Sequence, residues 1–236
     1  MNRMGRLEER VGVEKAALMC RYMDAVLEKN RFINLTAILD RDEFIVKHLL
    51  DSLTILDLPE FRAAKTVVDV GTGSGFPGVP LAIACPEKDF VLIDSLNKRL
   101  RVISELTEAL DIRNVRTLHA RAEDAGRDAD CRDGFDLCVS RAVASMDVLA
   151  EWCLPLVRKG GFFVAMKGEK TEAELAEGAA AIRALAGEVV RVESAEVDET
   201  AEAHTLILIR KTGKTPAVYP RKAGTARKDP IRGKKK

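Results

Sequence analysis

The sequence predicts an α/β fold: a mainly parallel, seven-stranded sheet that ends in an antiparallel hairpin, preceded by an N-terminal helical layer. Apolar strands alternate with helices from Thr66 onward, which is typical of parallel sheets with right-handed crossovers. Only about seven residues separate the last two strands, whereas a parallel crossover needs about a dozen, so these strands should pair antiparallel. Residues 5–58 instead show the apolar spacing of helices, with no Gly or Pro between residues 14 and 58.

The individual elements follow from the same periodicities. The helical layer contains two apolar-periodic stretches joined by a connector at residues 32–38. The expected strands are Thr66–Val70, Phe90–Asp94, Val115–His119, Phe135–Ser140, Gly161–Lys167, Val189–Val197 and Thr205–Arg210. The expected helices between them are Gly78–Cys85, Asn97–Leu110, Met146–Val157 and Thr171–Ala186. We expect three regions: an N-terminal helical segment (1–62), the main α/β domain (63–212) and a basic C-terminal tail (213–236).

Composition excludes several classes of protein. Of the 236 residues, 47% are hydrophobic and 32% are charged, which is ordinary for a globular protein. The sequence has no apolar run of membrane-spanning length and no apolar segment typical of a secretory signal near Met1, so we expect a cytoplasmic protein that does not associate with membranes. The five cysteines are scattered and form no C-x-x-C pair, so we expect neither a metal site nor a redox motif.

The net charge of +1 conceals an asymmetry along the chain. The segment from Arg210 to Lys236 contains eleven Lys or Arg and one Asp, while the rest of the chain carries a net charge of −9. A basic segment on an acidic body is typical of nucleic-acid binding, and the alternative is a solvated terminus.

A glycine-rich turn follows the first strand. Within residues 71–78, Gly73, Gly75 and Gly78 form the pattern G-x-G-x-x-G between a strand and a helix. Glycines let the backbone turn tightly and leave room for a ligand against it, which points to Gly71 and Gly73. Asp94 ends the next strand, where a carboxylate can accept hydrogen bonds from the hydroxyl groups of a ribose. The pattern predicts a nucleoside-type ligand at this turn.

The turn itself does not distinguish NAD-dependent dehydrogenases from S-adenosylmethionine-dependent enzymes. The terminal hairpin suits the seven-stranded class I methyltransferase sheet, and the acidic turn at 120–124 offers a place for an adenine amino group. The sequence also lacks a second domain with a hydride-transfer His, Tyr or Lys. These features favour a Rossmann-like methyltransferase, with an NAD-dependent oxidoreductase and a non-enzymatic nucleotide-sensing module as alternatives.

Seven motifs occur in an order that resembles the RsmG family, also called GidB. They are Asn34–Ile38, His48–Ser52, Val68–Ile83, Asp94–Arg99, Arg121–Glu123, Ser140–Ala144 and Tyr219–Gly224. The resemblance extends from about Tyr22 to Ile231. It implies a 16S ribosomal RNA guanine-N7 methyltransferase that uses S-adenosylmethionine, with the RNA or the small ribosomal subunit as its partner and no obligate protein partner. A methyltransferase that acts on a non-RNA substrate remains an alternative.

The resemblance also implies which residues bind the donor and the RNA. The family's donor-binding positions correspond here to Gly71, Phe76, Ala122, Glu123 and Arg141, alongside Gly73 and Asp94 from the glycine turn. Lys167, Arg221 and Lys222 are plausible RNA contacts. No residue is expected to be catalytic, because guanine N7 carries a free lone pair and the reaction depends mainly on positioning.

The remaining expectations concern the tail and the histidines. We expect the tail, together with Lys98, Arg99 and Arg101, to contact RNA phosphates, and we expect truncation after Ile209 to weaken RNA binding while sparing the donor site. The three histidines, His48, His119 and His204, lie in no recognisable acid–base motif, so structural roles are expected for them.

Overall fold

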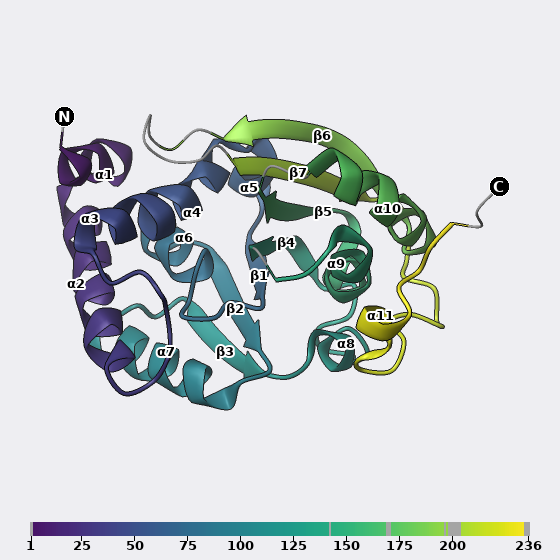
Figure 1. Cartoon of the computed structure of the whole chain (residues 1–236), viewed down its shortest axis with the longest axis horizontal. Coiled ribbons are helices and arrows are strands. Elements are labelled where there is room, and N and C mark those ends of the chain that lie inside the picture. The colour runs from purple at the N-terminus through teal and green to yellow at the C-terminus, as the bar shows by residue number, and fades with distance from the viewer. Residues whose placement is uncertain (1, 142, 169–170, 196, 198–203, 234–236) are drawn as a thin grey trace.

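A seven-stranded sheet with helices on both faces forms the centre of the structure (Figure 1). The computed structural model describes residues 2–141, 143–168, 171–195, 197 and 204–233. The strands are β1 (Thr66–Val70), β2 (Asp89–Asp94), β3 (Val115–His119), β4 (Phe135–Arg141), β5 (Val157–Lys167), β6 (Gly187–Ala195) and β7 (His204–Lys211). Their order is β3-β2-β1-β4-β5-β7-β6, with β7 antiparallel to both β5 and β6. The predicted fold class is confirmed, while the hairpin turn at 198–203 lies outside the described residues.

The N-terminal helices, α6 and α7 cover one face of the sheet (Figure 1). They are α1 (Arg3–Val11), α2 (Val13–Asn30), α3 (Arg41–Phe44), the π-helical segment η1 (Ile45–Leu50), α4 (Asp51–Leu53), the 3-10 turn η2 (Thr54–Asp57), α5 (Pro59–Ala63), α6 (Gly78–Ala84) and α7 (Asn97–Ala109). The opposite side carries α8 (Ala122–Ala125), α9 (Met146–Cys153), the 3-10 turn η3 (Leu154–Leu156), α10 (Thr171–Ala184) and α11 (Thr225–Lys228). The predicted helix Met146–Val157 is shorter than expected, because Pro155 has no N–H to continue α-helical bonding.

Strand residues alternate between the two sides of the sheet and supply both hydrophobic cores. Val67 and Leu92 pack under the N-terminal helices, whereas the neighbouring Val68 and Ile93 pack against the side that carries α9. The strands read as continuous apolar runs because helices bury both faces. The sheet is therefore a rigid platform, and its strand ends are the places where polar side chains can reach solvent or a ligand.

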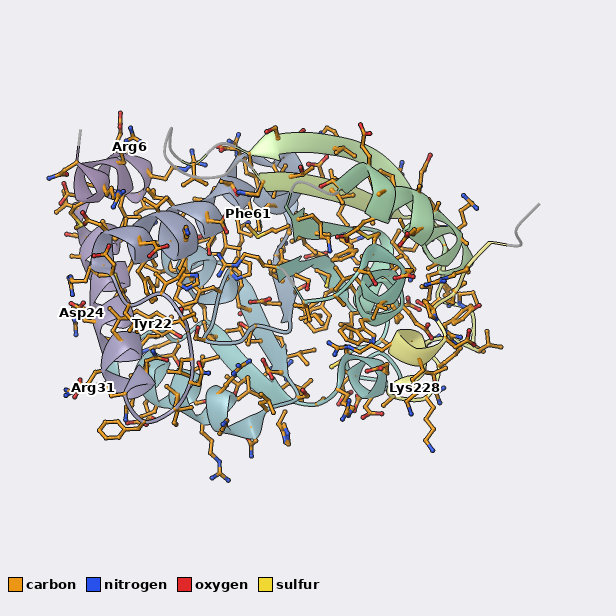
Figure 2. All side chains as sticks on the ribbon, viewed as in Figure 1. Arg6, Tyr22, Asp24, Arg31, Phe61 and Lys228 are labelled. Carbon is orange, nitrogen blue, oxygen red and sulfur yellow. The ribbon has the colours of Figure 1, made fainter. Side chains whose placement is uncertain are left out.

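The N-terminal layer is bound directly to the glycine turn. Tyr22 is fully buried on the inner side of α2 (Figure 2), and its hydroxyl donates a hydrogen bond of 2.9 Å to the carbonyl of Ser74. The ring of Phe76 lies edge-on to those of Tyr22 and Phe44, with centroids 5.9 and 5.4 Å away. The layer and the sheet thus share one core, and the division into separate regions at residue 62 stays a prediction.

The C-terminal tail packs on the body over its described length, residues 213–233. The guanidinium of Arg132 donates to the backbone carbonyls of Gly126, Thr215, Pro216 and Tyr219. Farther along, the side chain and backbone N–H of Arg221 both bond to the carboxylate of Glu151, at 2.6–3.1 Å. The tail is therefore an integral part of the fold over these residues, and residues 234–236 lie outside the described part.

The Arg221–Glu151 pair generates a stability prediction. Glu151 is fully buried, so removing its cation leaves an uncompensated charge in the interior. We expect Arg221→Ala to lower the free energy of unfolding by about 3 kcal/mol, measured by urea denaturation. Lys222→Ala, at the adjacent exposed position, is the matched control and should change it by less than about 0.5 kcal/mol. A loss below about 1 kcal/mol for Arg221→Ala would show that the tail is held by its other contacts.

Candidate functional site

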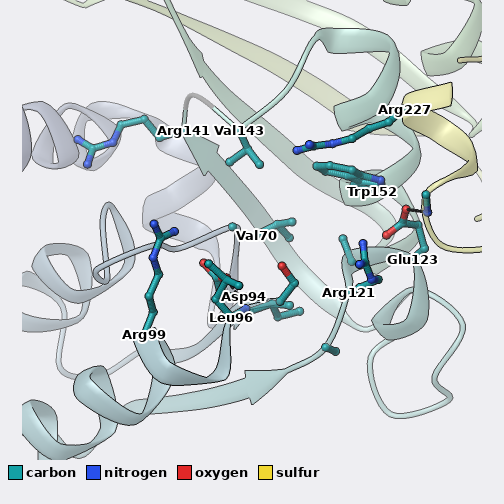
Figure 3. A pocket seen from close by; sticks show the side chains of 16 residues that line it. Val70, Asp94, Leu96, Arg99, Arg121, Glu123, Arg141, Val143, Trp152 and Arg227 are labelled. Atoms are coloured by element: carbon teal, nitrogen blue, oxygen red, sulfur yellow. Dashed lines mark hydrogen bonds between the residues drawn. The ribbon is translucent and has the colours of Figure 1, made fainter. Parts of the chain in front are cut away.

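A pocket of about 380 Å³ opens at the carboxyl ends of the central strands (Figure 3). It lies beside β1, where the strand order changes direction. From β1 the chain continues to β2 and β3 on one side, and then returns to β4 on the other side of β1. Ligands of open α/β sheets bind at such a switch point. The walls come from the ends of β1 to β4, from Trp152 of α9, and from Gly224 and Arg227 of the tail.

The glycine turn forms one wall of the pocket. Gly71 has a φ of +75°, and a Cβ there would lie 2.7 Å from a methyl group of Val143, so only glycine fits. Gly73 also has a positive φ, of +62°, and its N–H donates a hydrogen bond of 3.0 Å to Asp94. The predicted turn therefore exists in the predicted place, with Gly71 lining the pocket and Gly73 joining the turn to β2.

Asp94 lies buried at the end of β2 and borders the pocket. Its two carboxylate oxygens accept hydrogen bonds from the backbone N–H groups of Gly73 and Leu96, at 3.0 and 2.8 Å. Each oxygen can accept a further bond, so the carboxylate can still receive the hydroxyl groups of a sugar. The predicted ribose contact fits this geometry and stays a prediction.

Ala122 and Glu123 form another part of the pocket wall, where the chain turns into α8. The Glu123 carboxylate is buried, and one of its oxygens accepts a 2.8 Å hydrogen bond from the N–H of Gly224 (Figure 3). The expectation that truncation after Ile209 spares the donor site stays a prediction, and the contact of the tail with this pocket argues against it. Gly224 and Arg227 line the same pocket as Glu123, so truncation after Ile209 would remove part of the wall.

Arg141 borders the pocket, but its guanidinium points away from it (Figure 3). The guanidinium donates to the Asp51 carboxylate at 2.7 Å and to the Lys47 carbonyl at 3.0 Å. The other oxygen of Asp51 lies 2.9 Å from Nδ1 of His204. Burial opposes the ionisation of Asp51, but the hydrogen bond from His204 and the charge of Arg141 overcome it and lower the pKa of this carboxyl. In this structure, Arg141 joins the end of β4 to the N-terminal layer.

His48 is held between Arg141 and Thr36. Arg141 can only donate, so the His48 Nδ1, 3.1 Å away, must accept, and Nε2–H then donates to the Thr36 hydroxyl at 2.9 Å. Burial and the neighbouring charge of Arg141 lower the pKa of His48 to about 4, which keeps the ring neutral at neutral pH. The ring stacks on Phe76 with centroids 4.8 Å apart.

Phe76 occupies a different place from the one expected for a donor contact. Its side chain is only 4% exposed and lies within the aromatic cluster of Tyr22, Phe44 and His48, outside the lining of the pocket. It fixes the glycine turn against the N-terminal layer. This side chain can therefore affect donor binding only through its packing against the glycine turn.

Two of the three expected RNA contacts have partners inside the protein. Lys167 is buried, donates to the Ala144 carbonyl at 2.7 Å and pairs with Glu174 at 2.5 Å. Arg221 donates hydrogen bonds to the buried carboxylate of Glu151. The structure thus assigns these two cations to the fold, and of the three predicted positions only Lys222 is left exposed.

Several residues of the site were not found by sequence reasoning. Trp152 and Arg227 line the pocket, yet they lie in none of the seven motifs, and Val143 lies in the motif Ser140–Ala144 without having been singled out. Arg99 also lines the pocket, and it was expected to contact RNA and not to border the donor site. Asp69 did carry a signal, since it is an acidic residue inside an otherwise apolar strand.

Asp69 lies beneath the glycine turn and is fully buried. One of its oxygens accepts hydrogen bonds from the Thr72 hydroxyl at 2.7 Å and from the Gly78 N–H at 3.0 Å, while the other has no partner among the described residues. Burial raises the pKa of this carboxyl to about 6, although the two hydrogen bonds oppose the shift. The carboxylate joins the middle of the turn to the start of α6.

This raised pKa predicts a pH dependence of stability. A carboxyl with a raised pKa stabilises the fold below its unfolded pKa of 3.8, and this contribution is lost as the pH rises through about 6. Relative to Asp69→Asn, the wild type should therefore lose about 2 kcal/mol of unfolding free energy between about pH 4.5 and pH 7.5. Urea denaturation at several pH values measures this difference. The unfolding free energy of Asp124→Asn, a change at an exposed position, should vary with pH as that of the wild type does. If the difference in unfolding free energy between the wild type and Asp69→Asn did not change with pH, the raised pKa of Asp69 would be contradicted.

The sheet topology and the pocket at the glycine turn define a class I S-adenosylmethionine-dependent methyltransferase fold. A similar solved structure is the O-methyltransferase TomG from Streptomyces achromogenes, determined in complex with S-adenosylmethionine. It matches with a TM-score of 0.54 and 19% identity, over 82% of this chain and 90% of that chain. At this identity the likeness concerns the fold alone.

The family is shown by closer matches. Residues 15–204 match the GidB family, described as rRNA small subunit methyltransferase G. A ribosomal RNA small subunit methyltransferase G of Lactobacillus johnsonii is 46% identical over 89% of this chain and 89% of its own length. One of Clostridium tetani is 43% identical over 90% of this chain and 89% of its own length. The chain belongs to this family. The resemblance seen in its motifs is confirmed, and the dehydrogenase and non-enzymatic alternatives are set aside.

Two further findings concern the described residues. None of their helices combines the length and apolar character needed to cross a membrane. They also contain no group of three or more His, Cys, Asp or Glu side chains placed to hold a metal ion.

Proposed function

We propose that the protein transfers a methyl group from S-adenosylmethionine to N7 of a guanine in 16S ribosomal RNA of the small subunit. Family membership supports a methyltransferase of small-subunit ribosomal RNA. The single structural observation that carries the proposal is the pocket itself. It combines a glycine wall, the buried carboxylates Asp94 and Glu123, and a position at the switch point of the sheet.

The pocket fits this donor on three counts. Gly71 leaves space where a Cβ would collide with Val143, so a ligand can lie against the backbone. Asp94 can accept hydrogen bonds from ribose hydroxyl groups, and Glu123 can accept one from an adenine amino group. Its volume, about 380 Å³, lies in the range of small-molecule sites. When bound, the donor supplies a methyl group already activated by a positively charged sulfur.

The residues at the pocket suit positioning more than acid–base chemistry. Guanine N7 has an in-plane lone pair and needs no deprotonation, so the enzyme must align donor and base and exclude water. His48, which contacts the pocket residue Arg141, is neutral and has both ring nitrogens bonded, to Arg141 and to Thr36. We therefore assign no general base to this reaction.

Basic side chains around the pocket suit the RNA backbone. Arg99 reaches from α7 to the pocket (Figure 3), and its Nε is buried without a hydrogen-bond partner among the described residues. Lys98 and Arg101, close to Arg99 in the sequence, are exposed. Arg121, which lines the pocket, and Lys222 of the tail are exposed as well. Phosphate groups would satisfy such cations, and an RNA held there would present its base at the pocket mouth.

The decisive experiment uses the full-length protein, methyl-labelled S-adenosylmethionine and small ribosomal subunits that lack the modification, with naked 16S RNA in parallel. We expect label at one guanine, identified as 7-methylguanine by nuclease digestion and mass spectrometry. Label at another atom would change the proposed target. Absence of label together with bound NAD would refute the proposal.

The Arg99 contact yields a quantitative prediction. Arg99→Ala should weaken RNA binding about fivefold to tenfold and reduce the slope of log affinity against log salt by about 0.7–0.9, because one phosphate contact is lost. Filter binding across a salt series measures both quantities. Arg113→Ala is the matched control, since Arg113 is exposed in the loop between α7 and β3, at the opposite end of the sheet. An unchanged slope for Arg99→Ala would rule out the phosphate contact.

A further inference from the structure

Arg227 of the tail and Trp152 of α9 form a stacked pair in the wall of the pocket. The guanidinium carbon of Arg227 lies over the indole ring, 5.0 Å from its centroid. Figure 3 shows the two planar groups one above the other, on the side of the pocket where Glu123 lies and away from Asp94. Both side chains line the pocket together with Ala122 and Glu123. Two residues that are distant in sequence thus present one planar surface at the same end of the site.

The position of this pair is fixed by contacts on both sides of Arg227. Before it, Arg221 is bonded to the buried Glu151, and the N–H of Gly224 donates to Glu123 at 2.8 Å. After it, Arg232 lies 4.0 Å from the carboxylate of Asp147. These contacts hold the tail on both sides of Arg227 against the body, and the exposed guanidinium of Arg227 lies over Trp152 at the pocket.

Trp152 is the member of the pair with an unpartnered buried donor, whereas the Arg227 side chain is exposed. Arg227 makes no ion pair or hydrogen bond with any residue that the structure describes, and its recorded contact is the one with Trp152. Trp152 is only 8% exposed, and its Nε1–H is buried without a hydrogen-bond partner. Buried donors normally have a partner, so an unpartnered indole N–H in a pocket wall points to a missing ligand or ordered solvent.

We propose that Arg227 and Trp152 form the adenine-binding surface of the donor pocket. Adenine is planar and aromatic, and it stacks well on guanidinium and indole groups. Glu123 is the acceptor expected for its amino group, and this carboxylate is tied to the same tail segment through Gly224. Glu123, Trp152 and Arg227 line the same pocket, so a base whose amino group reaches Glu123 would lie close to the stacked pair. The inference rests on the proposed function, since it requires an adenosine-containing donor.

This assignment gives the tail a role different from the one its charge suggests. An arginine in a basic tail would ordinarily be taken for a phosphate contact. Here the exposed guanidinium lies over an aromatic ring in the pocket wall, which makes Arg227 a specificity-determining residue for the donor in this proposal. The methionine half of the donor would lie nearer the glycine turn, and its contacts should not depend on Arg227.

The test measures binding directly, without turnover. Trp152 is the only tryptophan of the chain, so its fluorescence reports on this wall of the pocket. S-adenosylhomocysteine and 5′-methylthioadenosine should both quench the emission of the wild-type protein, with dissociation constants that calorimetry reproduces. Arg227→Ala should weaken both ligands by the same factor, about tenfold, because they share the adenosine half. Arg227→Lys should recover only part of this loss, since its ammonium lacks the planar group.

Lys228→Ala is the matched control, because Lys228 belongs to the same short helix and extends away from the body of the protein (Figure 2). It should leave both dissociation constants unchanged. Circular dichroism and urea denaturation establish that each variant is folded. Equal affinity of wild type and Arg227→Ala for both ligands would overturn the inference, as would a loss confined to RNA binding. If the folded wild-type protein bound neither ligand, the proposed function itself would fail.

Discussion

The buried carboxylate of Asp69 is the interaction on which the site depends. It accepts hydrogen bonds from the Thr72 hydroxyl and the Gly78 N–H, and so fixes a glycine-rich segment that has little conformational preference of its own. Two further bonds hold the same turn, one from Gly73 to Asp94 and one from Tyr22 to the Ser74 carbonyl. Loss of backbone entropy in a flexible turn is costly, and these contacts offset it before any ligand arrives. The pocket wall is thereby preorganised.

The N-terminal layer is a structural part of the site although it contributes no lining residue to the pocket. Its aromatic residues surround Phe76, and Asp51 takes the guanidinium of Arg141 at the end of β4. Asp51 also pairs with His204 at the start of β7, so one carboxylate joins the helical layer to two strands. A change in the packing of this layer would therefore be transmitted to the glycine turn and to the end of β4 through direct contacts.

The sequence predicted the local features of this structure well, and missed the contacts between distant segments. The order and approximate positions of the strands followed from apolar runs, and the hairpin followed from the short spacing between β6 and β7, because both depend on neighbouring residues. The bounds of two strands were wrong, since β5 already begins at Val157 and β6 runs from Gly187 to Ala195. The orientation of Arg141 depends on Asp51, 90 positions earlier, and the contact between Glu123 and Gly224 spans 101 positions. No local pattern records such pairings. The net charge of the tail suggested RNA binding, because charge can be counted in the sequence. The position of the Arg227 guanidinium over Trp152 depends on the fold and could not be predicted in this way.

The participation of Gly224 in the pocket has a consequence for the biosynthesis of the protein. Translation proceeds from the N-terminus, so all seven strands of the sheet emerge before the segment that bonds to Glu123. A nascent chain that has reached the end of β7 contains every strand of the sheet, yet it still lacks one wall of the pocket, the partner of the buried Glu151 and the part of the second core that Ala226 supplies. Synthesis of the sheet and completion of the pocket are thus separated in time, and the pocket wall is complete only when Gly224 and Arg227 have left the ribosome.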